Sequence, residues 1–227
     1  AAAIKSQFLS ILSHEIRTPL NAVVGIAHIL MNENPREDQL ENLRTLQFSA
    51  ENLTGLINDI LDFSKIDSGK IELELVPFDL RTTLNRIVHS YSFLASEKNL
   101  DLTCEIDEDI PEMLIGDPVR ISQIVNNLIS NAIKFTEKGE IILRLELVGE
   151  IDKSVQVKFR CLDTGIGIPQ DKRDKIFELF TQASTDTTRK YGGTGLGLAI
   201  VKRLVELHRS EINVEPRVNG GTEFNFV

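Results

Sequence analysis

The sequence predicts two successive parts: an α-helical hairpin over residues 1–69 and an α+β two-layer sandwich over residues 70–227. Two observations lead to this division. Up to residue 66, apolar residues recur at spacings of three and four, which is the pattern of one helical stripe. From Lys70 onward, short alternating apolar runs are interspersed with helical patterns, which is typical of a mixed sheet with helices packed on one face.

Two long helices with a linker at 32–36 are predicted for the first part. The stripe of the first helix consists of Ile4, Phe8, Leu12, Ile16, Leu20, Val23, Ala27 and Leu30. The stripe of the second helix has the alternating spacing of a coiled-coil seam and consists of Leu43, Leu46, Ala50, Leu53, Ile57 and Ile60. A lone hairpin cannot cover both seams, so we expect two hairpins to form a four-helix bundle, which implies a homodimer. Gly69 is a plausible helix stop.

The second part is predicted to alternate between strands and helices. Strands are expected at 71–75, 100–106, 141–148, 155–162, 211–216 and 223–227. Helices are expected at 118–136, 172–180 and 196–208, and a further one should start at an Asp79 cap and end near Asn99.

Composition indicates a water-soluble globular chain, with 41% hydrophobic and 26% charged residues. A net charge of −9 argues against a broad contact with nucleic acid or an anionic membrane. No run approaches the roughly 18 apolar residues of a membrane span. Cys104 and Cys161 lie in alternating apolar runs, which favours buried thiols in a reducing compartment such as the cytosol. Since the chain starts inside a helical pattern and ends in a strand-like run, we expect a fragment of a longer protein.

The first motif with potential chemistry occupies residues 13–19 of the first predicted helix. At about 100° per residue, His14 points away from the neighbouring apolar positions, so its ring should be exposed. A neutral imidazole is nucleophilic at cellular pH, and Glu15 can hold or deprotonate its second ring nitrogen. Thr18, one turn further on, can position a water or a carboxylate, and Pro19 should bend the helix. The alternative is an exposed histidine with no chemical role.

Four polar residues share one face of the helix predicted at 118–136, namely Gln123, Asn127, Asn131 and Lys134. Ordinary solvated faces favour Glu and Lys over the poorer helix former Asn, so two stacked asparagines indicate a specific task. Their amide oxygens are hard, neutral ligands suited to Mg²⁺. Lys134 adds a positive charge for phosphate oxygens. A solvated face without a ligand is the alternative.

A third motif follows the strand predicted at 155–162. Gly165 and Gly167 let a planar ligand approach the backbone closely, and Asp163 can accept a hydrogen bond from an exocyclic amine such as that of adenine. A tight turn without a ligand explains the glycines equally well.

A glycine-rich segment runs into the helix predicted at 196–208, and its residues include Gly193, Thr194, Gly195, Leu196 and Gly197. Free backbone N–H groups and a helix N-terminus together form a phosphate cradle, although the spacing fits neither the P-loop nor the dinucleotide motif. The polar segment 181–191 favours a mobile lid from which Arg189 and Lys190 can reach a γ-phosphate. A loop tip without a ligand is the alternative.

Taken together and in this order, these blocks resemble the homology boxes of the sensor histidine kinases. The phosphoacceptor, asparagine, first glycine, phenylalanine and second glycine boxes correspond to residues 8–20, 127–136, 163–168, 176–180 and 193–198. The resemblance spans nearly the whole chain. The stretch around His14 and residues 193–201 look most like the hybrid subfamily, whose members often carry receiver domains.

The resemblance implies a dimerisation and histidine phosphotransfer domain at 1–69, and a catalytic domain at 70–227 of the type shared with gyrase and Hsp90. It implies that ATP phosphorylates His14 and that the phosphoryl group then passes to an aspartate of a response regulator receiver domain, with phosphatase activity also open. By position it makes Glu15 the base and Thr18 a helper in dephosphorylation.

The resemblance further implies a site for ATP and Mg²⁺, with Asn127 and Asn131 at the metal. The implied nucleotide-binding residues are Asn127, Asn131, Lys134, Phe135, Asp163, Gly165, Gly167, Arg189, Lys190, Gly193, Thr194, Gly195, Leu196 and Gly197. We expect no nucleic-acid or membrane contact by this fragment, which would be the cytosolic part of a larger receptor.

One departure from the family pattern is Arg209-Ser210, which stands where paired glycines are usual, so the turn geometry there is an open point. The chain also allows two other functions. An ATPase of the same nucleotide fold, such as a chaperone or topoisomerase fragment, is disfavoured by the hairpin with His14. The other is a non-catalytic scaffold that binds nucleotide, or a degenerate kinase that acts mainly as a phosphatase. The sequence does not indicate the input signal, the cognate receiver, or whether phosphorylation occurs within or between subunits.

Overall fold

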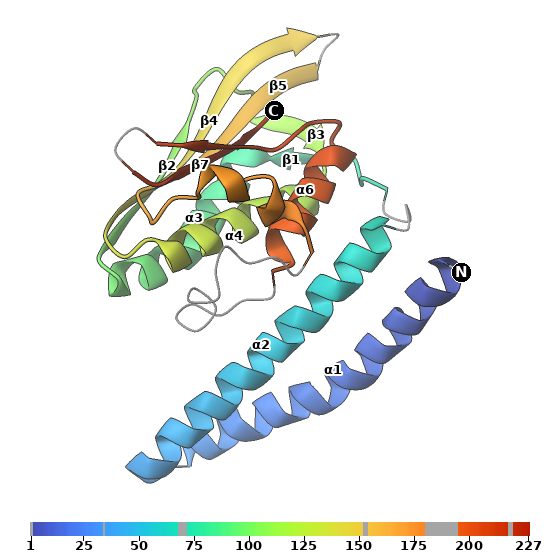
Figure 1. Ribbon diagram of the computed structural model, residues 1–227, viewed down its shortest axis with the longest axis vertical. Coiled ribbons are helices and arrows are strands. Elements are labelled where there is room, and N and C mark those ends of the chain that lie inside the picture. Colours follow the sequence, from blue (N-terminus) through green and yellow to red (C-terminus); the bar gives the residue numbers. More distant parts are fainter. Residues whose placement is uncertain (1, 34, 68–71, 152–153, 180–194, 218–219) are drawn as a thin grey trace. The chain divides into compact units, whose positions relative to one another are not determined.

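The chain folds into two compact units, Ala1–Ile71 and Glu72–Val227 (Figure 1). The structure is a computed structural model that describes residues 2–33, 35–67, 72–151, 154–179, 195–217 and 220–227. At residues 2–14 and at several positions of the second helix it describes the backbone alone.

The first unit is a hairpin of two long helices, α1 (Ala2–Asn32) and α2 (Glu37–Asp67), which confirms the sequence prediction for this region. The backbone N–H of Arg36 donates to the side chain of Gln39 at 3.1 Å, the back-bond of a helix N-terminal capping box. Midway along the hairpin, Arg17 Nη2 donates to Asn58 Oδ1 at 2.7 Å. These contacts fix where α2 begins and link it to α1.

The apolar stripes of the hairpin are only partly covered. Ala27 and Ala50 are buried, with 1% and 5% of their surface exposed. Larger apolar side chains remain exposed along both helices, namely Ile16, Val23, Ile26, Ile29, Leu30, Leu46 and Leu53. An apolar surface of this extent is unusual for a stable monomer, so one hairpin alone does not complete its core.

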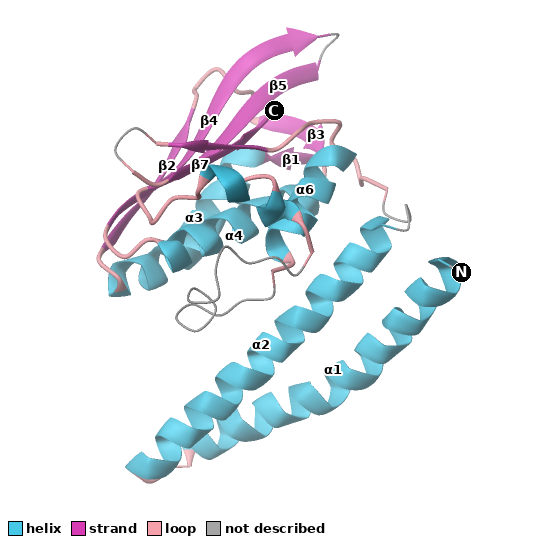
Figure 2. Cartoon of the chain, viewed as in Figure 1, coloured by secondary structure: helices cyan, strands magenta, loops and turns pink. Residues whose placement is uncertain are grey.

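The second unit is built on a five-stranded mixed sheet (Figure 2). Its strands lie in the order β2 (Leu100–Ile106), β4 (Gly139–Ile151), β5 (Ser154–Asp163), β7 (Thr222–Phe226) and β6 (Asn213–Pro216). Strands β2 and β4 are parallel, and the remaining neighbours are antiparallel. All five strands were predicted from alternating apolar residues.

Three helices, α3 (Leu80–Glu97), α4 (Pro118–Phe135) and α6 (Gly197–Leu207), cover one face of this sheet (Figure 2). The predicted cap of α3 is confirmed, because the Asp79 side chain accepts the N–H of Thr82 at 2.8 Å. The apolar face of α4 is buried through Ile124, Val125, Leu128, Ile129, Ala132 and Ile133. The buried side chains of β4 are Ile141, Leu143 and Leu145. The helices and the sheet therefore share one core.

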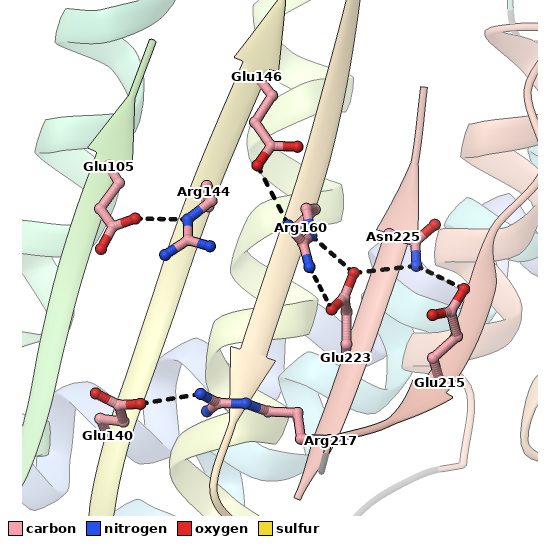
Figure 3. A network of polar contacts seen from close by, with 9 residues as sticks. All are labelled: Glu105, Glu140, Arg144, Glu146, Arg160, Glu215, Arg217, Glu223 and Asn225. Carbon is pink, nitrogen blue, oxygen red and sulfur yellow. Dashed lines mark hydrogen bonds and ion pairs between the residues drawn. The ribbon is translucent and has the colours of Figure 1, made fainter. Parts of the chain in front are cut away.

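The opposite face of the sheet carries ion pairs instead of helices (Figure 3). Arg160 on β5 forms two hydrogen bonds to Glu223 on β7, at 2.7 and 2.8 Å, and a third to Glu146 on β4 at 3.2 Å. Contact with Arg160 lowers the pKa of Glu223 below its ordinary value. Because Glu223 is almost fully buried, this shared fork is a stronger contact than an exposed surface ion pair.

The strand predicted at 71–75 is wrong, since residues 72–75 have no regular structure. The strand begins instead at β1 (Val76–Asp79), which pairs with β3 (Met113–Gly116), a strand that we did not predict. The backbone N–H of Glu74 donates to the buried side chain of Asp117 at 3.0 Å. That hydrogen bond ties the segment to the start of α4 and takes it out of any strand ladder.

The helix predicted at 172–180 is also wrong. Two short 3₁₀ turns are present, η1 (Gln170–Lys172) and η2 (Lys175–Phe177), and Glu178 is already extended. Within them only Ile176 is buried, and Phe177 packs edge-on against Phe224 on β7. With a single buried residue across both turns, the segment lacks the apolar stripe that would hold a continuous helix against the core.

Both cysteines are free thiols in the structure. Burial raises the pKa of Cys161 to about 12 and that of Cys104 to about 11, so both remain protonated at neutral pH. Among the described helices, none has the length and apolar character needed to cross a membrane.

Helix α6 ends in the turn that the sequence left open. Arg209 N–H donates to Glu206 O at 2.9 Å, and Ser210 N–H donates to Val205 O at 3.1 Å. This pair of bonds is a Schellman motif, which requires a left-handed residue at the position of Arg209. Arg209 has a φ of 60°. The chain therefore keeps the glycine-type turn while holding a side chain in a conformation that costs free energy.

We predict that Arg209→Gly raises the free energy of unfolding by about 1 kcal/mol, because glycine adopts a positive φ without a steric penalty. Urea unfolding followed by circular dichroism measures the change. Arg209→Ala is the matched control, since it removes the same side chain but keeps the Cβ atom. An equal gain in both variants would contradict backbone strain as the cause.

Candidate functional site

The site is centred on Asp163, the last residue of β5. Side chains alternate along a strand, so Asp163 follows Phe159 and Cys161 onto the face that the helices cover. Only 6% of its surface is exposed. A carboxylate placed beneath a helix layer must find hydrogen-bond donors there.

Backbone N–H groups supply those donors. Asp163 Oδ1 accepts the N–H of Gly165 at 2.8 Å and the N–H of Thr222 at 3.2 Å. Among the described residues, Oδ2 accepts no hydrogen bond. Burial raises the pKa of Asp163, while the two N–H groups and the charge of Arg217 act in the opposite direction. One oxygen is therefore fixed by the fold and the other is left for a ligand.

Glycines let three backbone segments meet around this carboxyl group. A Cβ atom on Gly165 would lie 2.5 Å from Phe135 O, and one on Gly221 would lie 2.0 Å from Asp163 O. Gly221 also has a φ of 99°. The end of α4, the loop after β5 and the start of β7 are thus packed backbone to backbone.

Arg217 lies behind the carboxyl group, in the connection between β6 and β7. Its Nη2 atom donates to Glu140 Oε1 at 3.0 Å (Figure 3). The backbone oxygen of Arg217 accepts the N–H of Gly220 at 3.2 Å. The ion pair holds the guanidinium group near Asp163, where it favours the ionised carboxylate.

The C-terminal end of α4 meets the loop that follows Asp163, and the polar face of the same helix carries the predicted asparagines. Asn127 Nδ2 donates to Gln123 O at 3.0 Å, which directs Oδ1 away from its own helix. A Cβ atom on Gly197, at the start of α6, would lie 2.7 Å from that oxygen. Asn131 is half-buried, and its amide group makes no hydrogen bond within the described residues. Desolvation lowers the pKa of Lys134, whose ammonium group lies 4.9 Å from the ring centre of Phe135.

This face fits the donor set that Mg²⁺ prefers. The ion takes few protein ligands and keeps water and phosphate oxygens in its remaining positions. Asn127 Oδ1 is oriented by the hydrogen bond that the Nδ2 atom of the same amide donates to Gln123 O. The Asn131 amide makes no hydrogen bond with the described residues. Within the described ranges, no cluster of three or more His, Cys, Asp or Glu offers a different kind of metal centre. The two amide oxygens are thus the metal-ligand candidates that the described structure supports.

The described end of the glycine-rich segment leads into α6. Gly195 has a φ of 70°, and the N-cap residue of the helix is Leu196, whose side chain has no polar atom to cap the first turn. The Leu196 side chain is itself buried, so only its backbone can face a ligand. Gly167, in the loop after β5, has a φ of 71°. The N-terminus of a helix favours an anion, because its backbone N–H groups and its dipole both point toward the ligand.

Other predicted site residues fall outside this description. Arg189, Lys190, Gly193 and Thr194, and the lid predicted at 181–191, lie outside the described residues. His14 is helical in α1, but its side chain is not described, so its exposure stays a prediction.

Glu15 and Thr18 are exposed on α1, one and four residues after His14. Sequence reasoning missed three residues of the site in the second unit, namely Thr136, Arg217 and Thr222.

Residues 4–69 match the His Kinase A (phospho-acceptor) domain. Residues 116–227 match the histidine kinase-, DNA gyrase B- and HSP90-like ATPase domain. The helical hairpin is thus a phospho-acceptor domain, and most of the α+β unit is an ATPase domain of this superfamily.

Curated relatives agree with these matches. The signal transduction histidine-protein kinase BarA of Escherichia coli is 43% identical over 226 residues, which are 100% of this chain and 25% of BarA. The sensor histidine kinase GacS of Pseudomonas protegens is 45% identical over 224 residues, which are 99% of this chain and 24% of GacS. The chain therefore spans about a quarter of the length of these relatives.

Solved structures lead to the same family. Full-length ShkA in complex with AMPPNP is 36% identical with a TM-score of 0.79, and the match covers 97% of this chain and 45% of ShkA. The catalytic domain of the histidine kinase ThkA is 30% identical with a TM-score of 0.55, and the match covers 67% of this chain and 93% of that domain. The fold and the site define a phospho-acceptor hairpin joined to an ATPase sandwich. The chain belongs to the sensor histidine kinases.

We predict opposite pH effects for two aspartates. The folded-state pKa of Asp163 is raised, so its ionisation costs stability as the pH rises from the ordinary Asp range, about 3.9, through the folded pKa. Asp163→Asn should therefore unfold at a higher urea concentration than wild type at neutral pH. The difference should shrink on acidification.

Asp107→Asn is the matched control for this prediction. Backbone N–H groups of Asp109 and Leu147 lower the pKa of Asp107, so its contribution to stability is present at neutral pH and is lost as the pH falls through that lowered pKa. This variant should be less stable than wild type at neutral pH and approach it in acid. The same sign of change in both variants would contradict the assigned environments.

Proposed function

We propose that this chain is the catalytic core of a two-component sensor kinase, which uses ATP to phosphorylate His14 and passes the phosphoryl group to an aspartate of a response regulator receiver domain. The observation that carries the proposal is the second oxygen of Asp163, which accepts no hydrogen bond from the described residues although only 6% of the residue's surface is exposed. The phospho-acceptor match over residues 4–69 of the same chain supplies the target.

The nucleotide base binds at Asp163. Its Oδ2 atom accepts a hydrogen bond from the exocyclic amine of adenine, while Oδ1 is held by the backbone N–H groups of Gly165 and Thr222. Gly165 and Gly167 carry no side chain, so at these two positions of the neighbouring loop the flat base can approach the backbone. The complex of ShkA with AMPPNP, an ATP analogue, supports a nucleotide of this class.

The triphosphate binds at the start of α6. The backbone at Gly195, Leu196 and Gly197 faces its oxygens, and the dipole of α6 favours their negative charge. Lys134 contributes a positive charge from α4. We also assign phosphate contacts to Gly193, Thr194, Arg189 and Lys190, which lie outside the described residues.

Asn127 and Asn131 are the residues that we assign to Mg²⁺. When bound, the ion balances the negative charge of the phosphate oxygens. The chain's own part is to present two neutral amide oxygens next to the phosphate end of the site, at a position where a carboxylate would repel the nucleotide.

The chemical step is an in-line displacement at the γ-phosphorus. A ring nitrogen of neutral His14 forms the new N–P bond, the bond from the γ-phosphorus to the bridging oxygen breaks, and ADP leaves with that electron pair. Glu15 takes the proton from the second ring nitrogen. Thr18, on the same helix, positions the water or the carboxylate that later removes the phosphoryl group.

Three wider assignments belong to the same proposal. The exposed apolar residues of the hairpin, including Ile26 at 58% and Ile29 at 57% exposure, are covered by a second copy in a homodimeric four-helix bundle. Residues 1–69 serve dimerisation and phosphotransfer, and residues 70–227 serve catalysis. The chain acts in the cytoplasm as part of a larger receptor.

Labelled ATP tests the acceptor. Wild type incubated with γ-labelled ATP and Mg²⁺ should gain acid-labile label, and His14→Gln should lose it entirely while still binding ATP, because its substitution lies in the other compact unit. Scintillation counting and calorimetry measure the two properties. Label that survives in His14→Gln would refute the assigned acceptor.

Subunit mixing tests whether the reaction crosses the dimer. Asn131→Ala should abolish phosphorylation by removing an assigned metal ligand, and His14→Gln removes the acceptor. If the phosphoryl group moves between subunits, co-refolded mixed dimers should regain label on the Asn131→Ala chain, up to about half of the wild-type amount. Since neither variant chain carries both native residues, mixed dimers that gain no label would show transfer within one subunit.

A further inference from the structure

Thr136 is a fully buried residue whose hydroxyl group has no assigned partner. It caps the C-terminus of α4, with its N–H donated to Ala132 O at 3.0 Å. None of its surface is exposed. Its Oγ1 atom makes no hydrogen bond in the part of the chain that the structure describes. The backbone role of Thr136 as a cap needs no hydroxyl, so the fold alone does not account for this group.

The hydroxyl group lies next to the base-binding carboxylate. A Cβ atom on Gly165 would lie 2.9 Å from Thr136 Oγ1 and also 2.9 Å from Asp163 Oδ1. The two oxygens are therefore within a few ångströms of each other. The N–H of Ile166 donates to Phe135 O at 3.3 Å, which fastens the end of α4 to the loop after β5. The hydroxyl and the carboxylate thus belong to one rigid junction.

The junction holds one buried unsatisfied hydroxyl group and one carboxylate oxygen that no described residue contacts by a hydrogen bond. Asp163 Oδ2 accepts no hydrogen bond from the described residues, and Thr136 Oγ1 makes none with them either. Buried polar groups in native proteins are nearly always paired with protein, ordered water or a ligand. A carboxylate oxygen can only accept, whereas a hydroxyl can also donate. Together they offer an acceptor beside a donor.

We propose that Thr136 is a second base-specificity residue, whose hydroxyl group donates to the ring nitrogen next to the amine that Asp163 binds, directly or through one buried water. This inference rests on the proposed function. A 6-aminopurine presents an N–H donor at the amine and an acceptor at the adjacent ring nitrogen. A 6-oxopurine presents the reverse order, so the pair of residues selects adenine over guanine and hypoxanthine.

The test uses the whole chain and two nucleotides, ATP and purine riboside triphosphate, which lacks the amine but keeps the ring nitrogen. Calorimetry gives Kd for wild type, Thr136→Val, Thr136→Ser and Asp163→Asn. Valine has nearly the shape of threonine without the hydroxyl, and serine keeps the hydroxyl. Thr136→Val should weaken both nucleotides by about tenfold, as expected for one lost hydrogen bond, and Thr136→Ser should stay within about threefold of wild type.

The aspartate variant separates the two roles. Asp163→Asn should weaken the binding of ATP much more than the binding of purine riboside triphosphate, because only ATP has the amine.

The ligand-free Thr136→Val chain should melt at or above the wild-type temperature, because the lost hydroxyl had no partner in the fold. A merely structural hydroxyl would instead lower the melting temperature.

Three results would overturn the inference. The first is a Thr136→Val variant that binds ATP with wild-type affinity. The second is a Thr136→Val variant whose melting temperature falls while its nucleotide affinity is unchanged. Loss of ATP binding with retained purine riboside triphosphate binding would also contradict it, since that pattern belongs to the amine. If wild type binds neither nucleotide, the proposed function itself fails, and this outcome is distinct from the other three.

Discussion

The site depends on the placement of one carboxyl group beneath a layer of helices. Asp163 ends β5 on the buried face, where its charge is costly unless donors surround it. The fold supplies two backbone N–H groups, from Gly165 and Thr222, and both reach the same oxygen. This uneven division leaves the second oxygen free for an external donor. Burial raises the pKa of Asp163, so ionisation of this carboxyl group costs the folded state free energy.

Helix α4 connects that carboxyl group to the rest of the unit. At its start, buried Asp117 accepts the N–H groups of Val119 and Arg120 and also that of Glu74. At its end, Phe135 O accepts the N–H of Ile166 in the loop after β5. Between these ends the helix presents an apolar face to the core and an asparagine face to the site. The same element therefore fixes the geometry of the core and the geometry of the ligand contacts.

Local signals in the sequence predicted most elements correctly, because helix caps and apolar alternation act over a few residues. The Asp79 cap and the five strands of the main sheet are examples. The misplaced strand at 71–75 reflects a hydrogen bond between Glu74 and Asp117, which are 43 residues apart, and the missed strand β3 forms by pairing with the distant β1. Thr222 reaches Asp163 across 59 residues, through the pairing of β5 with β7. Arg217 joins Glu140 across 77 residues. No periodicity in the chain signals such contacts.

Strand β6 closes one border of the main sheet, and it is only four residues long. It ends at Pro216, which has no N–H to offer an incoming strand, and it carries Glu215 on its exposed length. Edge strands that are short, charged and end in proline discourage pairing with a strand of another chain. The β6 edge of one sandwich is therefore protected against pairing with a strand from another copy, even at high protein concentration.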